Sequence, residues 1–124
     1  MGTFVIKKVT MGIKYDLKAT NGIIIGTSNV MTSKSVCEQN IACVKRDAPA
    51  AVIDDQTKQR FVVQENPKFL LFTDHRGETR FTLCSVNGDN ILTSREGYKS
   101  KAAAINGIES VKRNAVDAEI VSMV

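Results

Sequence analysis

The clearest hydrophobic pattern in the chain is the alternation of apolar and polar residues from Ile13 to Thr20. The apolar set is Tyr15, Leu17 and Ala19, and the charged set is Lys14, Asp16 and Lys18. A period of two predicts a β-strand with one buried face. Asn21-Gly22 follows directly and favours a two-residue type I′ hairpin turn. Residues 2–8 and 23–26 predict the flanking strands, and the apolar run 23–26 favours a central place in a sheet.

A helix is predicted after these strands, from Lys34 to about Asp47. Ser33 is a suitable N-cap because its hydroxyl can accept a backbone N–H of the first turn. Apolar residues recur at intervals of three or four positions along one face, as Cys37, Ile41, Val44 and Ala48. Pro49 ends the helix, and residues 51–53 predict a short closing strand.

The same succession of patterns returns in the second half of the chain. The apolar stripe of its helix has the same spacing, with Ala104, Ile108, Val111 and Ala115. The predicted elements, in order, are a strand at 68–74, a strand at 80–85, an Asn87-Gly88 turn, a strand at Ile91-Leu92, a helix capped by Ser100 and a closing strand at 118–121.

The two runs are similar residue by residue, which indicates a tandem duplication. Matching residues are separated by 65 to 67 positions, as in Phe4 and Phe69, Asn21 and Asn87, and Ile41 and Ile108. The spacing changes only in turns or loops, where insertions are best tolerated. We therefore divide the chain into a first repeat (residues 1–55), a connector (residues 56–66) and a second repeat (residues 67–124). Within the connector, residues 61–63 predict an edge strand.

The expected fold is α+β, with tandem β3-α repeats sharing one antiparallel sheet and helices packed on one face. A unit of about 60 residues has a marginal core by itself. Joining two such units edge to edge removes an exposed sheet edge from each and merges their cores, which gives a sheet of about six strands. The two repeats are therefore expected to form a single compact domain.

One motif of the chain reads NG-xx-I-x-TS, followed by SK and then by GI-x-SVK-x-NA. Through this motif, the chain resembles the YegP-like family of small bacterial proteins of unknown function. The resemblance covers nearly the whole chain, and the second repeat carries the fuller motif. The first repeat departs from it at four positions, with Thr32 for Tyr98, Asn40 for Gly107, Cys43 for Ser110 and Asp47 for Asn114. The resemblance implies a β3-α unit paired in tandem or as a homodimer, and it implies no activity.

Gly107 is expected at a close contact between helix and sheet. A glycine inside a helix is less stable than alanine by about 1 kcal/mol, so its presence needs a compensating contact. It precedes Ile108 and therefore lies on the buried side. Asn40, at the matching position of the first repeat, needs hydrogen-bond partners if it is buried.

Basic residues near the helix ends and one tyrosine are the candidate interaction residues. The net charge is +4, with nine Lys or Arg against five Asp or Glu in residues 1–60 and eight of each in residues 61–124. These residues could bind phosphate or RNA, but cations in a last helical turn also offset the helix dipole. The tyrosine could instead pack on the first turn of the second helix. The candidates are Lys34, Lys45, Arg46, Tyr98, Lys101, Lys112 and Arg113.

No catalytic, cofactor or metal site is predicted. His75, the single histidine, falls in a turn without a nucleophile beside it. Three cysteines, at positions 37, 43 and 84, form no CxxC pair, and we interpret them as reduced thiols. Cys84 alternates outward and is expected to be the most accessible. On the face opposite the helices, Phe72 is the one aromatic residue that could stack on a nucleic-acid base.

We therefore expect a cytoplasmic, non-enzymatic module that binds another macromolecule, most simply a protein. The alternative is a weak RNA- or DNA-binding protein that uses the basic helix ends and the open sheet face. No signal peptide is found at the start of the sequence, and no apolar run reaches the length of a membrane span. The chain is expected to be a monomer with intramolecular pairing of its repeats, with a homodimer as the other arrangement.

Overall fold

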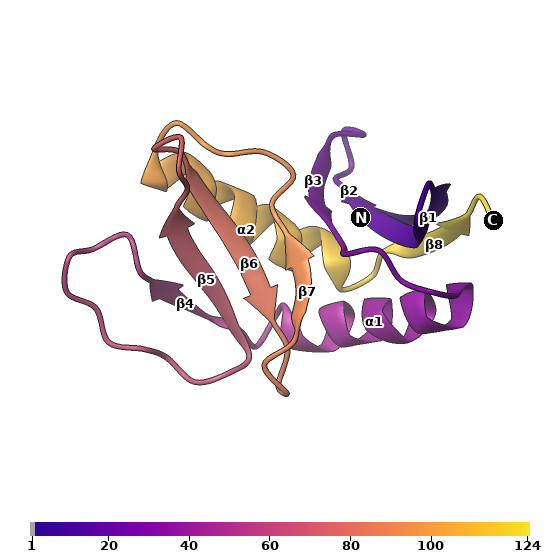
Figure 1. The fold of residues 1–124 in the computed structure, drawn as a ribbon, viewed down its shortest axis with the longest axis horizontal. Coiled ribbons are helices and arrows are strands. Elements are labelled where there is room, and N and C mark those ends of the chain that lie inside the picture. Colours follow the sequence, from indigo (N-terminus) through magenta and orange to yellow (C-terminus); the bar gives the residue numbers. More distant parts are fainter. Residues whose placement is uncertain (1) are drawn as a thin grey trace.

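The computed structural model describes residues 2–124 and contains eight strands and two helices in these residues (Figure 1). The first half comprises β1 (Thr3–Val9), β2 (Gly12–Lys18), β3 (Ile24–Thr27), α1 (Lys34–Asp47) and β4 (Val52–Asp55). The second half comprises β5 (Lys68–Thr73), β6 (Thr79–Cys84), β7 (Asn90–Thr93), α2 (Lys101–Ala115) and β8 (Glu119–Ser122). The α+β class is confirmed, and the elements follow one another in the same order in both halves.

The predicted helices and their caps are confirmed. The Ser33 hydroxyl accepts the backbone N–H of Val36 at 3.2 Å, and the Ser100 hydroxyl accepts that of Ala103 at 3.1 Å. These caps satisfy donors that have no partner inside the helix. Every residue of the two predicted apolar stripes is fully buried: Cys37, Ile41, Val44, Ala48, Ala104, Ile108, Val111 and Ala115.

The hairpin turns differ from the predicted two-residue type. Among residues 2–124, no residue other than glycine has a positive φ, so Asn21 cannot adopt the type I′ geometry. Instead, Ala19 accepts the N–H of Gly22 and donates its own N–H to Ile23, each at 2.9 Å. Gly22, with φ +85°, is thus the last residue of a three-residue loop, and Gly88 has the same place in the second half.

The sheet has eight strands in the order β4-β5-β6-β7-β3-β2-β1-β8, and its edges differ from the expected fold. The inner six strands pair antiparallel, as predicted, but β4 runs parallel to β5 and β8 runs parallel to β1. Each closing strand therefore joins the first strand of the other half. A helix that crosses over the face of the sheet allows the strand after it to pair in the parallel direction. The predicted six-stranded antiparallel sheet is therefore only the inner part of a mixed, eight-stranded sheet.

Few backbone hydrogen bonds join the two halves at their central seam, where Thr27 and Thr93 are the one paired position between β3 and β7. Both helices cross this seam, since α1 contacts β2 and β7 while α2 contacts β6, β2 and β3. One hydrophobic cluster includes the buried residues of both halves. Packing in this shared core and the exchanged strands hold the halves together.

The C-terminal ends of the helices also tie the halves to each other. The Asp47 carboxylate accepts the backbone N–H of Val86, in the turn between β6 and β7, at 3.3 Å. The Thr20 hydroxyl, in the turn between β2 and β3, donates to Asn114 Oδ1 at 3.3 Å. Asp47 and Asn114 occupy matching positions in the two halves, so the exchange of residue type preserves the contact between helix end and hairpin.

Gly107 lies at a close contact, as predicted. A Cβ atom at this position would stand 2.8 Å from Tyr98 Cζ and 3.1 Å from Phe81 Cε2. Tyr98 stacks on Phe81 with ring centroids 6.1 Å apart. In the first half, Tyr15 takes the place of Phe81, and its hydroxyl lies within hydrogen-bonding distance of Asn40 Oδ1 and of the carbonyl of Ile91, which share its one proton. The polar partner expected for Asn40 is therefore present.

The residue that matches Tyr98 in the first half is Met31, and the alignment of Thr32 with Tyr98 was wrong. Backbone hydrogen bonds join Met31 to Ile13, and they join Tyr98 to Thr79 in the same antiparallel manner. Loop residues between the third strand and the helix cannot be aligned by periodicity, because a loop has none.

The connector contains no strand in the structure. Residues 61–63 are exposed and irregular, so the predicted edge strand is wrong. Asp54 and Asp55, at the end of the first repeat, belong to β4, and each pairs with a lysine. Lys68 Nζ lies 2.8 Å from Asp54, and Lys101 Nζ lies 3.0 Å from Asp55. These pairs allow charged residues to occupy an edge strand.

Candidate functional site

Most of the predicted basic residues already have a partner within the protein. Lys45 Nζ donates to the carbonyl of Ala118 at 2.7 Å, which ties α1 to the start of β8. Arg46 forms a two-bond pair with Asp47, at 2.7 and 2.9 Å. Lys101 pairs with Asp55, and the Lys112 ammonium lies 5.9 Å from the centroid of the Phe69 ring. A ligand at the helix ends would have to compete with these contacts.

The remaining candidates lie at separate places on the surface. Lys34 is exposed at the start of α1. Arg113 is exposed near the end of α2, beside a hollow that it shares with the turn between β2 and β3. Tyr98 is half-buried and packs on Phe81 and Gly107, and burial raises the pKa of its phenol. The structure therefore does not bring the seven predicted residues together into one site.

Neither the thiols nor the histidine is grouped with other reactive side chains. The cysteines are free, with Cys37 fully buried and Cys43 and Cys84 half-buried. Burial raises the pKa of Cys84 and of Cys37. His75 is exposed in its turn. Within residues 2–124, no three His, Cys, Asp or Glu side chains are close enough together to hold a metal ion.

The sheet face opposite the helices is covered by ion pairs. Asp16 is almost fully buried there, with Lys7 Nζ at 2.6 Å and Lys14 Nζ at 3.6 Å from its carboxylate. The Thr27 hydroxyl donates to the same carboxylate at 2.7 Å. Burial by itself raises the pKa of Asp16, but these hydrogen bonds and lysine charges together hold it below its usual value. Lys7 and Lys14, which could otherwise contact the phosphates of a nucleic acid on this face, are thus paired with Asp16.

The outer edge of β8 is a surface of a different kind, because it carries unpaired backbone groups and apolar side chains. On its inner edge, the N–H groups of Glu119 and Met123 donate to the carbonyls of Gly2 and Ile6, at 3.3 and 2.8 Å. Alternate residues of a strand direct their backbone groups to opposite edges. The N–H and C=O groups of Ile120 and Ser122 therefore face away from the sheet.

Four apolar side chains are exposed along and just beyond this edge: Ile120 (42%), Val121 (45%), Met123 (71%) and Val124 (48%). β8 ends one side of the sheet order, and Figure 1 shows no further element beyond it. We call Ile120–Val124 and its free backbone groups the β8 edge. Contiguous exposed apolar surface next to an open strand edge is typical of a protein-binding surface.

The opposite sheet edge, at β4, is protected. Asp54 and Asp55 occupy the positions that Val121 and Ser122 have in β8, as the matching pairings with β5 and β1 show. The Asp54 carboxylate accepts the backbone N–H of Gln64 at 3.1 Å, which draws the connector back over β4. Two equivalent edges of one molecule thus differ: one is acidic and covered by the connector, and the other is apolar and bare.

The sequence did not allow us to identify the β8 edge. It also did not allow us to identify a group of three arginines in the second half, Arg76, Arg80 and Arg95. Residues 118–121 were interpreted only as a closing strand, because their position at the sheet edge depends on the exchange of strands between the halves. Arg76, Arg80 and Arg95 lie far apart along the chain, so no local pattern joins them. The apolar run at 120–124, with no lysine or proline to protect an edge strand, was the available signal.

The fold therefore defines an α+β protein in which two β3-α-β halves exchange closing strands within one sheet. The sequence model of the family described as a domain of unknown function, DUF1508, matches residues 14–55 and 74–122. The chain belongs to this DUF1508 family, and the resemblance to YegP-like proteins is confirmed.

The relatives are bacterial proteins of the group named UPF0339. A UPF0339 protein of Bordetella pertussis is 37% identical over 114 residues, which cover 92% of this chain and 88% of the relative. The UPF0339 protein YegP of Yersinia pestis is 30% identical and covers 97% of this chain and 94% of its own length. A UPF0339 protein of Agrobacterium fabrum is 46% identical over 56 residues, which are 45% of this chain and 89% of that protein.

Solved structures share the fold. The solution NMR structure of yegP from E. coli, a protein of unknown function, superposes with a TM-score of 0.79 at 28% identity, covering 98% of this chain and 92% of that one. The NMR structure of a UPF0339 protein from Shewanella oneidensis gives a TM-score of 0.78. In the described part of the present chain, neither helix is long and apolar enough to cross a bilayer.

Proposed function

We propose that this chain is a non-enzymatic protein-interaction module whose β8 edge receives an extended segment of a partner protein. The observation that carries the proposal is the contrast between the two sheet edges. The β8 edge presents the free backbone groups of Ile120 and Ser122 beside exposed apolar side chains. A partner strand would satisfy these groups by continuing the sheet, with alternate apolar side chains packing on those of β8.

The chemistry of the expected partner follows from the edge. Backbone groups pair with any extended polypeptide, whereas a nucleic acid has no matching row of amides. Glu119 is the one ionisable side chain of β8, so a partner segment rich in Val, Ile or Leu is favoured over a strongly charged one. Binding by such contacts depends little on salt concentration, unlike binding to a polyanion.

The alternative, a weak RNA- or DNA-binding protein, has less support. Lys45, Arg46, Lys101 and Lys112 have intramolecular partners. Phe72, the aromatic residue considered for base stacking, is half-buried and paired with Arg80 across the strands. A mixed RNA shifted by the protein in a gel, with a shift lost in Lys45→Glu/Arg46→Glu, would favour this alternative over the protein module.

The test is a screen of displayed peptides followed by mapping of the bound peptide on the protein by NMR. Apolar extended peptides should shift the amide signals of residues 119–124 and of β1. Ile120→Pro removes an outward N–H and no bond to β1, so it should abolish binding while leaving the fold intact. Ile53→Pro is the matched control at the protected β4 edge, because Ile53 pairs with Phe69 as Ile120 pairs with Phe4 and its N–H also faces outward; it should leave peptide binding unchanged.

Two results would contradict the proposal. One is a set of selected peptides whose signals map to another surface of the protein. The other is binding that survives Ile120→Pro, since a partner strand cannot continue the sheet without that N–H. Self-association through β8, detected as a dimer by sedimentation, would identify a second copy of the chain as the occupant in place of a partner protein.

A further inference from the structure

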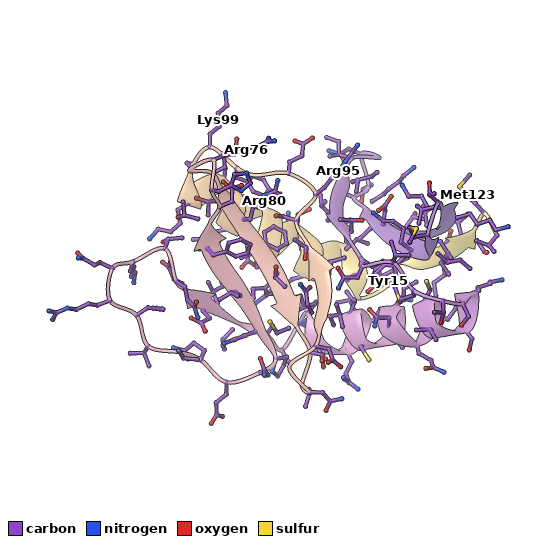
Figure 2. The ribbon with its side chains drawn as sticks, viewed as in Figure 1. Tyr15, Arg76, Arg80, Arg95, Lys99 and Met123 are labelled. Carbon is purple, nitrogen blue, oxygen red and sulfur yellow. The ribbon has the colours of Figure 1, made fainter. Side chains whose placement is uncertain are left out.

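Three arginines surround a hollow of about 300 Å³ in the second half, at the end of the sheet where Figure 2 labels them. Arg76 lies in the turn between β5 and β6, Arg80 lies in β6, and Arg95 follows β7. Three separate segments therefore converge on one place. The lining is completed by Glu78, Glu96 and Gly97.

Backbone contacts fix these segments to one another. Thr79 N–H donates to the carbonyl of Tyr98 at 2.9 Å, and Tyr98 N–H donates back to the carbonyl of Thr79 at 2.8 Å. A Cβ on Gly97 would stand 2.6 Å from the Cβ of Glu78, so only glycine allows the two segments to approach this closely. The fold thus fixes the relative positions of the segments that carry the lining side chains.

One guanidinium is held in a defined orientation. Arg80 Nε donates to Asp74 Oδ2 at 2.9 Å, and its Nη1 lies 3.4 Å from the carbonyl of Ser94. Asp74 Oδ1 accepts the backbone N–H groups of Arg76 and Glu78, at 2.9 and 3.0 Å. Asp74 therefore organises the turn that carries Arg76 and, at the same time, orients Arg80.

The other charged side chains of the lining are not engaged with one another. The ion pairs found among residues 2–124 include none of Arg76, Arg95, Glu78 and Glu96. Guanidinium donors and carboxylate acceptors thus stand around the same hollow and can both contact a ligand. In the first half, Lys14 and Asn29 match Arg80 and Arg95, and the turn between β1 and β2 carries no charged residue, so the same fold holds one cation there.

We propose that Arg76, Arg80 and Arg95 bind the phosphate group of a small phosphate monoester that also carries hydroxyl groups. Guanidinium groups match the geometry of phosphate oxygens and bind them through paired hydrogen bonds. The carboxylates of Glu78 and Glu96 accept hydrogen bonds from the hydroxyl groups of the same ligand. These carboxylates repel a continuous phosphate backbone, and Tyr98 is stacked on Phe81, so a polynucleotide fits less well. This site is separate from the β8 edge and does not depend on its function.

The test is a titration of the full chain, monitored through its amide NMR signals. The probes are glycerol 3-phosphate, inorganic phosphate, glycerol and a short single-stranded RNA. Glycerol 3-phosphate should cause saturable shifts at Arg76, Glu78 and residues 95–97. Inorganic phosphate should bind at the same place more weakly, because it lacks the hydroxyl groups, and glycerol should cause no saturable shift.

Arg95→Gln removes an exposed guanidinium and should weaken binding about tenfold or more, which is the usual effect of a lost charged hydrogen bond. Lys99→Gln is the matched control: it removes an equal charge from an exposed side chain that points away from the hollow (Figure 2). It should change the affinity less than twofold. Unchanged signals elsewhere in both variants would show that the fold is retained.

The proposal is overturned if the shifts fail to saturate, or if Lys99→Gln weakens binding as much as Arg95→Gln, because either result indicates unspecific attraction by positive charge. Tighter binding of inorganic phosphate than of glycerol 3-phosphate would refute the role given to Glu78 and Glu96. Tighter binding of the RNA through the same residues would replace the monoester by a nucleic acid.

Discussion

Replacing Gly107 by valine tests the closest contact between a helix and the rest of the core. In an exposed helix, this change would raise stability by a few tenths of a kcal/mol, since valine has a somewhat higher helix propensity than glycine. Here the new Cβ would stand 2.8 Å from Tyr98 Cζ and 3.1 Å from Phe81 Cε2, and the two methyl groups would need still more room. Gly107→Val should therefore destabilise the protein.

The expected loss is about 2 kcal/mol, within the range observed for overpacked cores. Tyr98 can yield only by leaving Phe81, and their stacked contact contributes about 1 kcal/mol. Unfolding by urea, followed by circular dichroism because the chain has no Trp, gives the change in the free energy of unfolding. The melting temperature should fall by about 8 °C.

A double-mutant cycle separates crowding from helix propensity. Tyr98→Ala removes the ring that meets the new side chain, so most of the loss caused by Gly107→Val should disappear in the double variant. The reasoning is refuted if Gly107→Val is neutral or stabilising. It is also refuted if its effect is the same with and without Tyr98, because the cause would then lie elsewhere in the helix.

Three further predictions concern the core, the ion pairs and the exchanged strands. Tyr15→Phe should lower the free energy of unfolding by about 2 kcal/mol, since Asn40 and the carbonyl of Ile91 lose the hydroxyl that they share. Adding Asn40→Gly, which reproduces the Phe81 and Gly107 pair of the second half, should recover part of the loss. Asp16 has a lowered pKa in the folded protein. Its contribution to the free energy of unfolding is therefore present above its unfolded pKa of about 3.9 and is lost as the pH falls through its folded pKa. In acid titrations of stability, the Asp16→Asn variant should be less stable than the natural protein at neutral pH and should lose less stability below about pH 4. A truncation that ends at Asp55 leaves β1 without β8 and β4 without β5, so it should be unfolded or self-associated in gel filtration, and a well-folded monomer would contradict the exchange.

The sequence was sufficient for those parts of the fold that depend on neighbouring residues. Helix caps such as Ser33 and Ser100 act within one turn, and the apolar stripes follow from the helical period, so both were predicted. The hairpin loop was wrong in detail because Asn-Gly also suits a three-residue loop that ends in glycine, and the pattern alone does not separate the two.

The exchange of closing strands was not predicted, because the partner of a short strand is set by distant contacts. Val52–Asp55 could have paired with either half by its apolar pattern, and its choice of β5 depends on where α1 crosses the sheet. The arginine hollow was missed for the same reason: the pairing of Thr79 with Tyr98 brings its segments together.

Hydrogen exchange of the amides in β8, measured residue by residue on the free protein, tests the account most directly. If β8 pairs with β1 of the other half and its outer edge is bare, the amide hydrogens of Val121 and Met123, which face β1, should exchange slowly. Those of Ile120 and Ser122 should exchange fast. Fast exchange at all four would mean that β8 does not pair with β1. Slow exchange at Ile120 and Ser122 would mean that the edge is already covered, and that no partner strand can be received there.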